Sequence, residues 1–343
     1  MEKIGNFILK LFELLKSDPQ TAIAKYLIGA SLVLLVGIGS LTYTYKEHSL
    51  QYADEANIMG YFLLAIGIIM LIHRYITIKN NAVSLAYGIG IKGMNIHTPL
   101  EAIPKYERFD CIEIDLETID SYDRNTVIEN YKFNKKLLEN RIQNKSSKKI
   151  YVGALGSFPY LFLLGSLFRN AYSNVSILDY SRHANGGGKW YKLPFISNKN
   201  EDIHHVLVSG DMTIDKKIQE LNDKDNVEVG IALGYTFSSN INAIPSELQD
   251  NILYLNHSYG IGHDMLSNEE SQRRLLYELS TYMASLWSHH QKIHLFVSAQ
   301  ASVCINIGKS YMNNAHGVLV LHNYDNSSKT YNWSIEFDRG EII

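Results

Sequence analysis

Two turns rich in small residues follow apolar runs of the chain, and their composition suits the binding of an anion. The first turn contains Gly156 and Ser157 and leads into Phe158, and the second runs from Ser298 to Ser302. Small residues at the start of a helix let backbone amides approach a negatively charged ligand, and hydroxyl groups add hydrogen bonds. Neither turn has the Walker A or G-x-G-x-x-G pattern, so the sequence does not indicate ATP or dinucleotide binding in the usual manner. Each turn taken alone is also explained as a helix N-cap beside tight helix–sheet packing.

Aromatic and polar residues follow the next apolar runs. Tyr180 and Arg182 stand near the end of the first of these runs, and Tyr324 stands near the end of the second. An aromatic ring close to a guanidinium group suits a nucleobase and a phosphate, although ordinary surface-loop chemistry explains the same residues. We predict a ligand site formed by Gly156, Ser157, Phe158, Tyr180, Arg182, Ser298, Gln300, Ser302 and Tyr324.

The residue types that form catalytic or metal centres show no recognised pattern. Histidines cluster at His289, His290 and His294, but the chain has no H-E-x-x-H motif, no C-x-x-C pair and no G-x-S-x-G elbow. The two cysteines, Cys111 and Cys304, both lie in apolar runs, which favours buried thiols over a disulfide. We therefore predict a protein without enzymatic activity and without a metal site.

The elements that must position the predicted site occur twice. Residues 148–180 and 291–323 share the order strand, small-residue turn, helix and strand, and a further strand follows in 186–195 and in 326–337. Continuous apolar strands that alternate with helices indicate a largely parallel sheet covered on both faces. We predict an α/β fold of two Rossmann-like halves, with the ligand at the carboxyl ends of the strands. A constant offset relates Ile150 to Ile293, Gly165 to Gly308, Asn170 to Asn313 and Val175 to Val318.

Two long apolar segments precede this fold. Residues 26–45 contain no charged residue. In residues 58–78 the only ionisable side chains besides tyrosine are His73 and Arg74, which lie near one end. A helix rises about 1.5 Å per residue, so each segment matches a hydrocarbon core of about 30 Å. Lysines before the first segment and after the second place both chain termini in the cytoplasm. We predict two transmembrane helices in 26–79 (26–45 and 58–78, with a short external turn), a linker in 80–98 and a domain in 99–343 with halves 99–200 and 201–343.

The first 25 residues contain an amphipathic helix. One face carries Ile4, Phe7, Ile8, Leu11, Phe12 and Leu15. Such a helix either lies on the inner leaflet of a membrane or packs on the cytosolic domain or on a neighbouring copy, and the sequence favours neither alternative.

The charge balance excludes a general nucleic-acid binder. The chain has 32 Lys and Arg against 35 Asp and Glu, a net charge of −3. A protein that binds DNA or RNA along its surface needs an excess of positive charge. We expect no binding of nucleic-acid polymers, and a bound nucleotide would have to occupy a confined pocket.

The C-terminal part of the chain resembles a known family of sensor domains. From Glu270 onward, a long helix leads into an I-H-L-F strand, a small-residue turn and a helix with an A/C-x-x-x-G pattern, as in SAVED domains. Gln300 stands where the family commonly has Pro or another small residue. The resemblance covers about 99–343 and is strongest in the final 75 residues. The residues that carry it are His294, Leu295, Phe296, Ala301, Cys304 and Gly308.

This resemblance implies a function. SAVED domains resemble two fused CARF-like halves and sense cyclic oligonucleotides in the bacterial CBASS antiphage system. With two apolar segments, the chain resembles the two-transmembrane SAVED effector of that system, a multi-pass protein of the bacterial inner membrane. The resemblance implies a cyclic di- or trinucleotide as ligand and no other cofactor. It also implies that the ligand drives homo-oligomerisation through the SAVED domains, which clusters the helices in the lipid bilayer, disrupts the membrane and kills the infected cell.

Two other functions stay open at the level of sequence. The first is a membrane-tethered ring nuclease that degrades cyclic oligonucleotides, for which Ser157 and Arg182 are the available pair. The second is a membrane scaffold that recruits a partner protein.

Overall fold

A computed structural model describes most of the chain. The described residues are 2–18, 21–42, 50–80, 83–89, 98–108, 111–118, 122–142, 149–169, 174–181, 188–194, 205–207, 212–224, 227–237, 241–257, 260–262, 266–312 and 317–343. Arg182 and residues 43–49, at the end of the first predicted membrane segment and the start of the turn after it, lie outside them. The rest of the predicted external turn, from Leu50 onward, is helical and belongs to α3 (Leu50–Asn80).

The chain forms two compact units that are interleaved along the sequence. A helical unit comprises Met1–Val83 and Ile103–Ile112, and an α/β unit comprises Ser84–Ala102 and Glu113–Ile343. The chain therefore passes between the units three times. Ile103, at the start of the returning segment, is buried.

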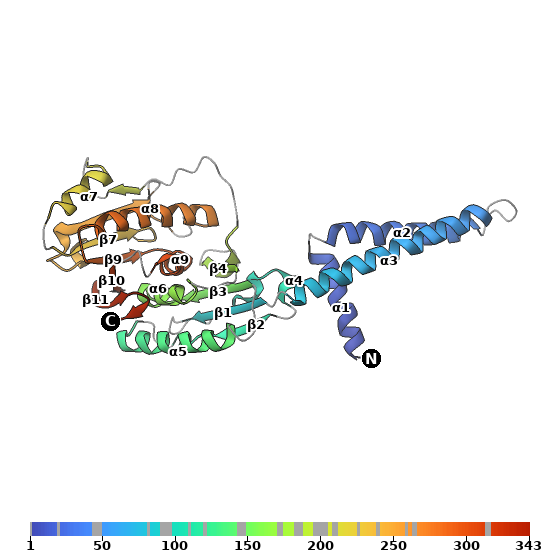
Figure 1. Ribbon diagram of the computed structural model, residues 1–343, viewed down its shortest axis with the longest axis horizontal. Helices are drawn as coiled ribbons and strands as arrows, with labels where there is room; N and C mark the ends of the chain where they lie inside the picture. The colour runs from blue at the N-terminus through green and yellow to red at the C-terminus, as the bar shows by residue number, and fades with distance from the viewer. Residues whose placement is uncertain are drawn as a thin grey trace. The chain divides into compact units, whose positions relative to one another are not determined.

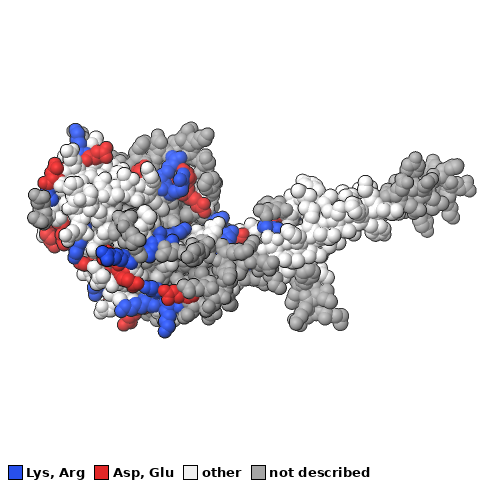
Figure 2. All heavy atoms as spheres, in the orientation of Figure 1, with Lys and Arg blue, Asp and Glu red and all other residues white. Residues whose placement is uncertain are grey.

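The helical unit contains α1 (Glu2–Ser17), α2 (Ala22–Thr42), α3 (Leu50–Asn80) and the short α4 (Lys105–Arg108). Figure 1 shows α2 lying along α3. Two glycines of α3 allow this approach, because a Cβ atom at Gly60 would lie 3.0 Å from Leu35 Cγ and one at Gly67 would lie 2.7 Å from Ile28 Cγ1. In Figure 2, the surface of the described parts of α2 and α3 is almost free of charged atoms.

The predicted membrane hairpin is only partly covered by the structure. Among the described residues, one helical segment, Asn57–Thr77 in α3, is long and apolar enough to cross a membrane, and Ala22–Leu35 in α2 is a shorter apolar run. The first predicted span, 26–45, runs from α2 into residues outside the described part. The two-span hairpin therefore stays a prediction.

The α/β unit contains two mixed sheets that are rich in parallel pairs. The first has the order β2-β1-β3-β4-β5 and the second the order β12-β11-β10-β9-β7-β8-β6. In the first sheet β3 and β4 are parallel and β5 pairs antiparallel with β4. In the second sheet β7, β8, β9 and β10 are joined by parallel pairs, and β6, β11 and β12 add antiparallel edges. The strands are β1 (Val83–Ile89), β2 (Ile112–Asp115), β3 (Lys149–Leu155), β4 (Asn174–Ser181), β5 (Lys189–Lys192), β6 (His205–Leu207), β7 (Val229–Gly234), β8 (Ile252–His257), β9 (Lys292–Ser298), β10 (Val318–Asp325), β11 (Thr330–Asp338) and β12 (Glu341–Ile342).

The linker predicted for 80–98 is wrong at Val83–Ile89. Val83–Ile89 form β1, which lies between β2 and β3 in the first sheet. Leu85 and Ala86 are fully buried there. The apolar run that follows the second predicted span is therefore a core strand, and the α/β unit begins at Ser84 and not at residue 99.

The helices of the α/β unit are α5 (Arg124–Ile142), α6 (Phe158–Leu167), α7 (Ile214–Asn222), α8 (Glu269–Trp287) and α9 (Ala301–Ser310). Short 3-10 turns lie at η2 (Pro99–Ala102), η4 (Ile241–Ala243) and η5 (Gln249–Asn251). Helix α6 contacts β10 of the second sheet, and α9 contacts β3 and β4 of the first. The two helices thus lie together where the sheets meet (Figure 1).

The repeat seen in the sequence has a structural counterpart with one register difference. The bounds of β9 and α9 follow those of β3 and α6 at the predicted offset of 143 residues. On the next strand the offset grows by one, because Ile150 pairs with Val175 whereas Ile293 pairs with Leu319. The predicted match of Val175 to Val318 is therefore wrong, since the connection from α9 to β10 is one residue longer. Tyr180 and Tyr324 become equivalent in this register.

Helices α6 and α9 cross at two equivalent glycines. A Cβ atom at Gly165 would overlap the carbonyl oxygen of Ile305, and one at Gly308 would overlap that of Phe162. Phe162 and Ile305 are themselves separated by the same offset as the glycines. The crossing is thus two-fold symmetric, and it requires glycine because the obstructing atoms belong to the backbone.

Candidate functional site

One cavity of about 730 Å³ opens at the carboxyl ends of β3, β4, β9 and β10. Seven of the nine predicted site residues line it, namely Gly156, Ser157, Phe158, Tyr180, Ser298, Gln300 and Tyr324. Arg182 lies outside the described residues, and Ser302 does not line the cavity. The strand ends gather these residues because parallel strands place their carboxyl ends at one edge of a sheet.

The first turns of α6 and α9 form two walls of the cavity. Ser157 and Gln300 precede these helices with extended backbone, and neither side chain caps its own helix. The N-terminus of a helix carries free amide groups and a partial positive charge. Two such ends beside one cavity provide two positions that favour negative charge.

The two equivalent tyrosines each pair with a second aromatic ring. Tyr180 contacts Trp190 with ring centroids 5.2 Å apart, and Tyr324 contacts Tyr331 at 5.3 Å, both edge to face. Tyr331 also lines the cavity. The edge-to-face contacts hold both tyrosine rings in place, so that each half offers a braced aromatic surface to a ligand.

Gln300 has a structural role that the sequence did not predict. Its Oε1 atom accepts a hydrogen bond of 2.9 Å from the amide of Leu266, and its Nε2 atom donates one of 3.0 Å to Asp179 Oδ2. Both ends of the amide are therefore engaged, and Gln300 holds the segment at Leu266 against the cavity wall.

Ser302 lies behind the wall, which corrects its predicted place in the site. The residue is fully buried. Its hydroxyl accepts a hydrogen bond of 2.7 Å from Gln272 Nε2, which also donates to the carbonyl oxygen of Leu266 at 2.9 Å. Ser302 in turn hydrogen-bonds to Asp179. Asp179, Gln300, Leu266, Gln272 and Ser302 thereby close a ring of polar contacts that joins β4, α8 and α9.

Asp179 is the main site residue that sequence reasoning missed. Only 1% of its surface is exposed. Its carboxylate accepts hydrogen bonds from Gln300, the backbone amide of Tyr180 at 3.0 Å, the hydroxyl of Tyr191 at 3.2 Å, and Ser302. Burial raises the pKa of Asp179, and these donors oppose that effect. A carboxyl group at the end of an apolar strand was the signal that could have revealed it.

The position of Asp179 makes the two helix ends at the cavity differ in their electrostatic environment. Asp179 hydrogen-bonds the backbone of Ser302 in the first turn of α9, so a carboxylate already occupies the positive end of that helix. The register places Asn323 at the equivalent point of the second sheet. Asn323 is neutral, and its Nδ2 atom donates to Asn332 Oδ1 at 3.0 Å. The N-terminus of α6 is therefore the better position for an anionic group.

Residues from the loop after β7 complete the cavity and were also missed. Phe237 is exposed at the rim, and its amide donates to Ser298 Oγ at 3.2 Å. Thr236 lines the cavity, and its hydroxyl is buried without a hydrogen-bond partner among the described residues. A buried hydroxyl in that state is available to a ligand. Nothing in the sequence distinguishes this loop from an ordinary turn.

The described cavity wall is poor in charge. Apart from tyrosine and cysteine, Asp179 is the one ionisable residue among those described that line it. Burial raises the pKa of Cys304 to about 12, so its thiol stays protonated and unreactive. Within the described residues, no group of three or more His, Cys, Asp or Glu side chains is placed to hold a metal ion.

Comparison with known proteins gives one family match. Residues 133–337 match the family described as SAVED, the SMODS-associated and fused to various effectors sensor domain. A comparison with curated protein sequences finds no match.

Several solved structures are similar at a distant level. They include the Acinetobacter baumannii Cap4 SAVED/CARF-domain containing receptor with the cyclic trinucleotide 2'3'3'-cAAA, at 12% identity and a TM-score of 0.45. The same receptor with 3'3'3'-cAAA gives the same values, and the receptor alone gives 14% identity and a TM-score of 0.43. The first match covers 85% of this chain and 59% of that one, so the chain spans less than two thirds of the receptor.

Proposed function

Because the chain belongs to the SAVED family of sensor domains, we propose that its cavity binds a cyclic oligonucleotide and that the protein is a membrane effector controlled by that ligand. The observation that carries the first part is a cavity bounded by the first turns of α6 and α9 and by two equivalent, braced tyrosines. Helix ends suit phosphates, and aromatic rings suit bases. A ligand that repeats phosphate and base around a ring matches a wall that repeats the same two features.

The size and polarity of the cavity support this ligand class. Its volume of about 730 Å³ lies within the range of about 300–1,000 Å³ that is typical of small-molecule sites. The free hydroxyl of Thr236 offers a hydrogen bond to a sugar or a base edge. The shortage of positive charge disfavours a long polyanion, which binds through many phosphate contacts.

Binding is tested on the full chain in detergent micelles with a panel of cyclic di- and trinucleotides that includes 2'3'3'-cAAA and 3'3'3'-cAAA. We expect one member of the panel to bind and to be recovered intact. Linear products would show a ring nuclease and overturn the receptor function. Binding of none of the panel would overturn the proposed ligand class.

Two substitutions locate the ligand. Tyr324→Ala removes a stacking surface worth about 1–3 kcal/mol, so affinity should fall by about fivefold to about a hundredfold. Thr236→Val keeps the shape of the side chain and removes a hydroxyl that has no described partner. This variant should bind less tightly and yet unfold no more easily than the parent. Tyr277→Ala on α8, an exposed position outside the cavity, is the control and should change neither property.

The second part of the proposal concerns the membrane. We propose that α2 and α3 cross the bacterial inner membrane as a hairpin with both termini in the cytoplasm, and that ligand-driven association of SAVED domains clusters these hairpins and disrupts the membrane during antiphage defence. The apolar segment Asn57–Thr77 supports this role. Gly60 and Gly67 are occupied by packing within the hairpin, whereas a Cβ atom at Gly29 would meet nothing within 4 Å. Gly29 therefore offers a place for close approach by another copy.

Membrane disruption is tested with the full chain in dye-loaded vesicles. Addition of the bound cyclic oligonucleotide should release the dye and enlarge the protein assembly, and Tyr324→Ala should shift the response to higher ligand concentration. If the ligand binds and the assembly grows while the vesicles stay sealed, the protein is a scaffold and not a membrane-disrupting effector.

A further inference from the structure

The corner between α1 and α2 is held by a group of contacts to backbone oxygens. Thr21 Oγ1 donates to the carbonyl oxygen of Asp18 at 2.7 Å and lies 3.3 Å from that of Leu14. Backbone bonds join Asp18 to Leu14 at 3.0 Å and Thr21 to Asp18 at 3.1 Å. These contacts satisfy carbonyls at the end of α1 that would otherwise lack partners. The direction in which α1 leaves α2 is therefore fixed.

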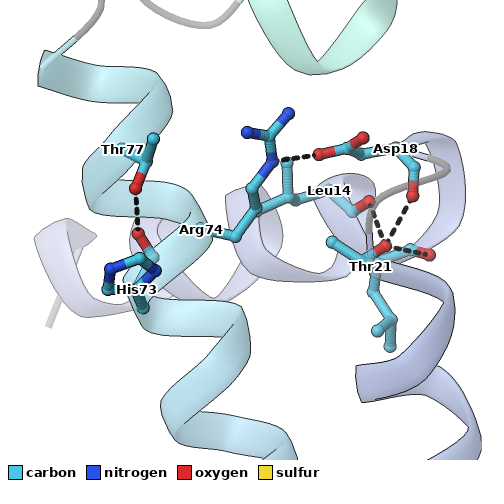
Figure 3. Close-up of polar contacts among 7 residues, drawn as sticks. Leu14, Asp18, Thr21, His73, Arg74 and Thr77 are labelled. Atoms are coloured by element: carbon cyan, nitrogen blue, oxygen red, sulfur yellow. Dashed lines mark hydrogen bonds and ion pairs between the residues drawn. The ribbon is translucent and has the colours of Figure 1, made fainter.

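A buried ion pair ties the same corner to α3. Arg74 Nε donates to Asp18 Oδ2 at 2.6 Å (Figure 3). The side chain of Asp18 is 1% exposed, and the guanidinium of Arg74 compensates its charge. Arg74 lies three residues before the end of the apolar segment Asn57–Thr77. The corner thus sits at one end of the segment proposed to cross the membrane.

One face of α1 is buried and the opposite face is exposed. Leu14 is buried within the helical unit, whereas Ile8, Leu9 and Phe12 are 45%, 64% and 66% exposed. At 3.6 residues per turn, Leu14 points about 180° away from the centre of these three residues. The corner therefore presents one apolar face of α1 outward and anchors the other.

The surroundings of this face match a lipid surface. Ile23 and Tyr26, in the first turns of α2, are also exposed, so both helices that meet at the corner carry exposed apolar side chains. Lys16 and Lys25 stand exposed beside it, where long basic side chains can reach anionic headgroups. Figure 1 shows α1 running steeply across the direction of α2 and α3. A helix that crosses a membrane-spanning pair in this way lies along the membrane plane.

We propose that α1 is an interfacial helix whose Ile8, Leu9 and Phe12 insert into the anionic inner leaflet, and that the Asp18–Arg74 pair holds it at that depth. This inference rests on the proposed insertion of α2 and α3. Interfacial helices bury their apolar face about 5–10 Å into the boundary between headgroups and acyl chains. Lipid is a better occupant than a second copy because the exposed basic side chains of Lys16 and Lys25 accompany these apolar residues, a combination that suits an anionic lipid surface.

The test uses spin labels on the full chain in vesicles of phosphatidylcholine and phosphatidylglycerol. Labels are placed at Phe12→Cys, Ile69→Cys and Tyr277→Cys in a Cys111→Ala background. Cys304 stays unlabelled because it is buried and its thiol is protonated. Accessibility to oxygen and to an aqueous nickel complex reports the depth of each label. Tyr277→Cys is the water-exposed control, and Ile69→Cys reports the proposed span.

The expected result is a graded loss of nickel accessibility from Tyr277→Cys to Phe12→Cys to Ile69→Cys. If Ile69→Cys is in lipid while Phe12→Cys stays open to nickel, the inference is wrong and the span stands. If Phe12→Cys is shielded only in samples where paired labels broaden each other's spectra, a second copy covers α1 and the inference is also wrong. Nickel access at Ile69→Cys would instead overturn the proposed span itself.

Discussion

Replacing the glycines at the crossing of α6 and α9 gives the sharpest test of the symmetric core. In Gly165→Ala, the new Cβ atom would lie 2.8 Å from the carbonyl carbon of Ile305 and 3.0 Å from the amide nitrogen of Lys309. In Gly308→Ala, it would lie 2.7 Å from the carbonyl carbon of Phe162. Carbon atoms in ordinary contact are about 3.5–4.0 Å apart, so either change must separate the helices by about 1 Å.

The cost of each substitution follows from this separation. Overpacking a core costs about 1–3 kcal/mol, and the upper end applies here because the obstructing atoms are backbone and cannot rotate away. Alanine has a higher helix propensity than glycine, which stabilises the folded state by about 1 kcal/mol and offsets part of this cost. Each variant should therefore lower the free energy of unfolding by about 2 kcal/mol. The double variant should lose less than the sum of the two single losses, by up to about 3 kcal/mol, since one separation relieves both clashes.

Urea unfolding of the full chain in detergent micelles measures these values through tryptophan fluorescence. All three tryptophans, at positions 190, 287 and 333, lie in the α/β unit, so the signal reports that unit alone. Gly153→Ala in β3 is the control, because its Cβ atom would meet side-chain atoms of Pro99 and Trp190 at 3.1–3.2 Å, and it should cost less than either helical variant. Strictly additive losses at Gly165 and Gly308 would refute the shared contact, and so would losses no larger than that of the control.

Three further predictions concern buried ionisable side chains. Arg74→Met removes the guanidinium that pairs with the buried carboxylate of Asp18, so the helical unit should lose about 3–5 kcal/mol of stability. The loss should appear as greater protease sensitivity in micelles. If adding Asp18→Asn restores no resistance, the pair does not account for the loss. Burial and the neighbouring His294 lower the pKa of His322 to about 3, so the folded state favours the neutral imidazole. The unfolded state binds a proton at this residue below about pH 6.5, so the unfolding free energy should fall by up to about 1.4 kcal/mol per pH unit as pH drops from about 6.5. The urea midpoint of His322→Asn should depend less on pH, and an unchanged slope would contradict this assignment. Burial raises the pKa of Asp179, so its carboxylate gains a proton more readily as pH falls, and the parent should then bind an anionic cyclic oligonucleotide more tightly. Asp179→Asn should bind this ligand more tightly than the parent at neutral pH, and its affinity should depend less on pH. A parent affinity that does not change with pH would count against the electrostatic asymmetry.

Local patterns were sufficient to predict the repeated elements. The small-residue turns, the strands before them and the position of Tyr180 and Tyr324 near strand ends are properties of short segments, and the structure places both tyrosines at one cavity. The one-residue difference between Val175 and Leu319 was hidden, because identity at a fixed offset cannot detect a longer connection when several apolar residues follow one another.

Features that depend on several elements could not be predicted. The donors to Asp179 come from β4, β5 and the start of α9, so no short segment shows that its carboxylate would be buried and satisfied. Gln300 looked like a ligand contact because its position in the turn was visible and its partner Leu266 was not. The strand β1 was assigned to a linker because its apolar run follows directly after a predicted membrane segment.

The interleaving of the two units has a practical consequence for anyone who wishes to separate the α/β unit from the helical unit. Removing the chain up to residue 79 leaves the returning segment Ile103–Ile112 without the helices of its own unit, including α1, which contacts α4. Such a fragment would be prone to aggregate for reasons unrelated to ligand binding. Conversely, a single proteolytic cut between residues 83 and 84 would not release the α/β unit, because Ile103–Ile112 would still hold it to α1–α3 by packing. A protease acting at that junction would leave the sensor attached to its helices.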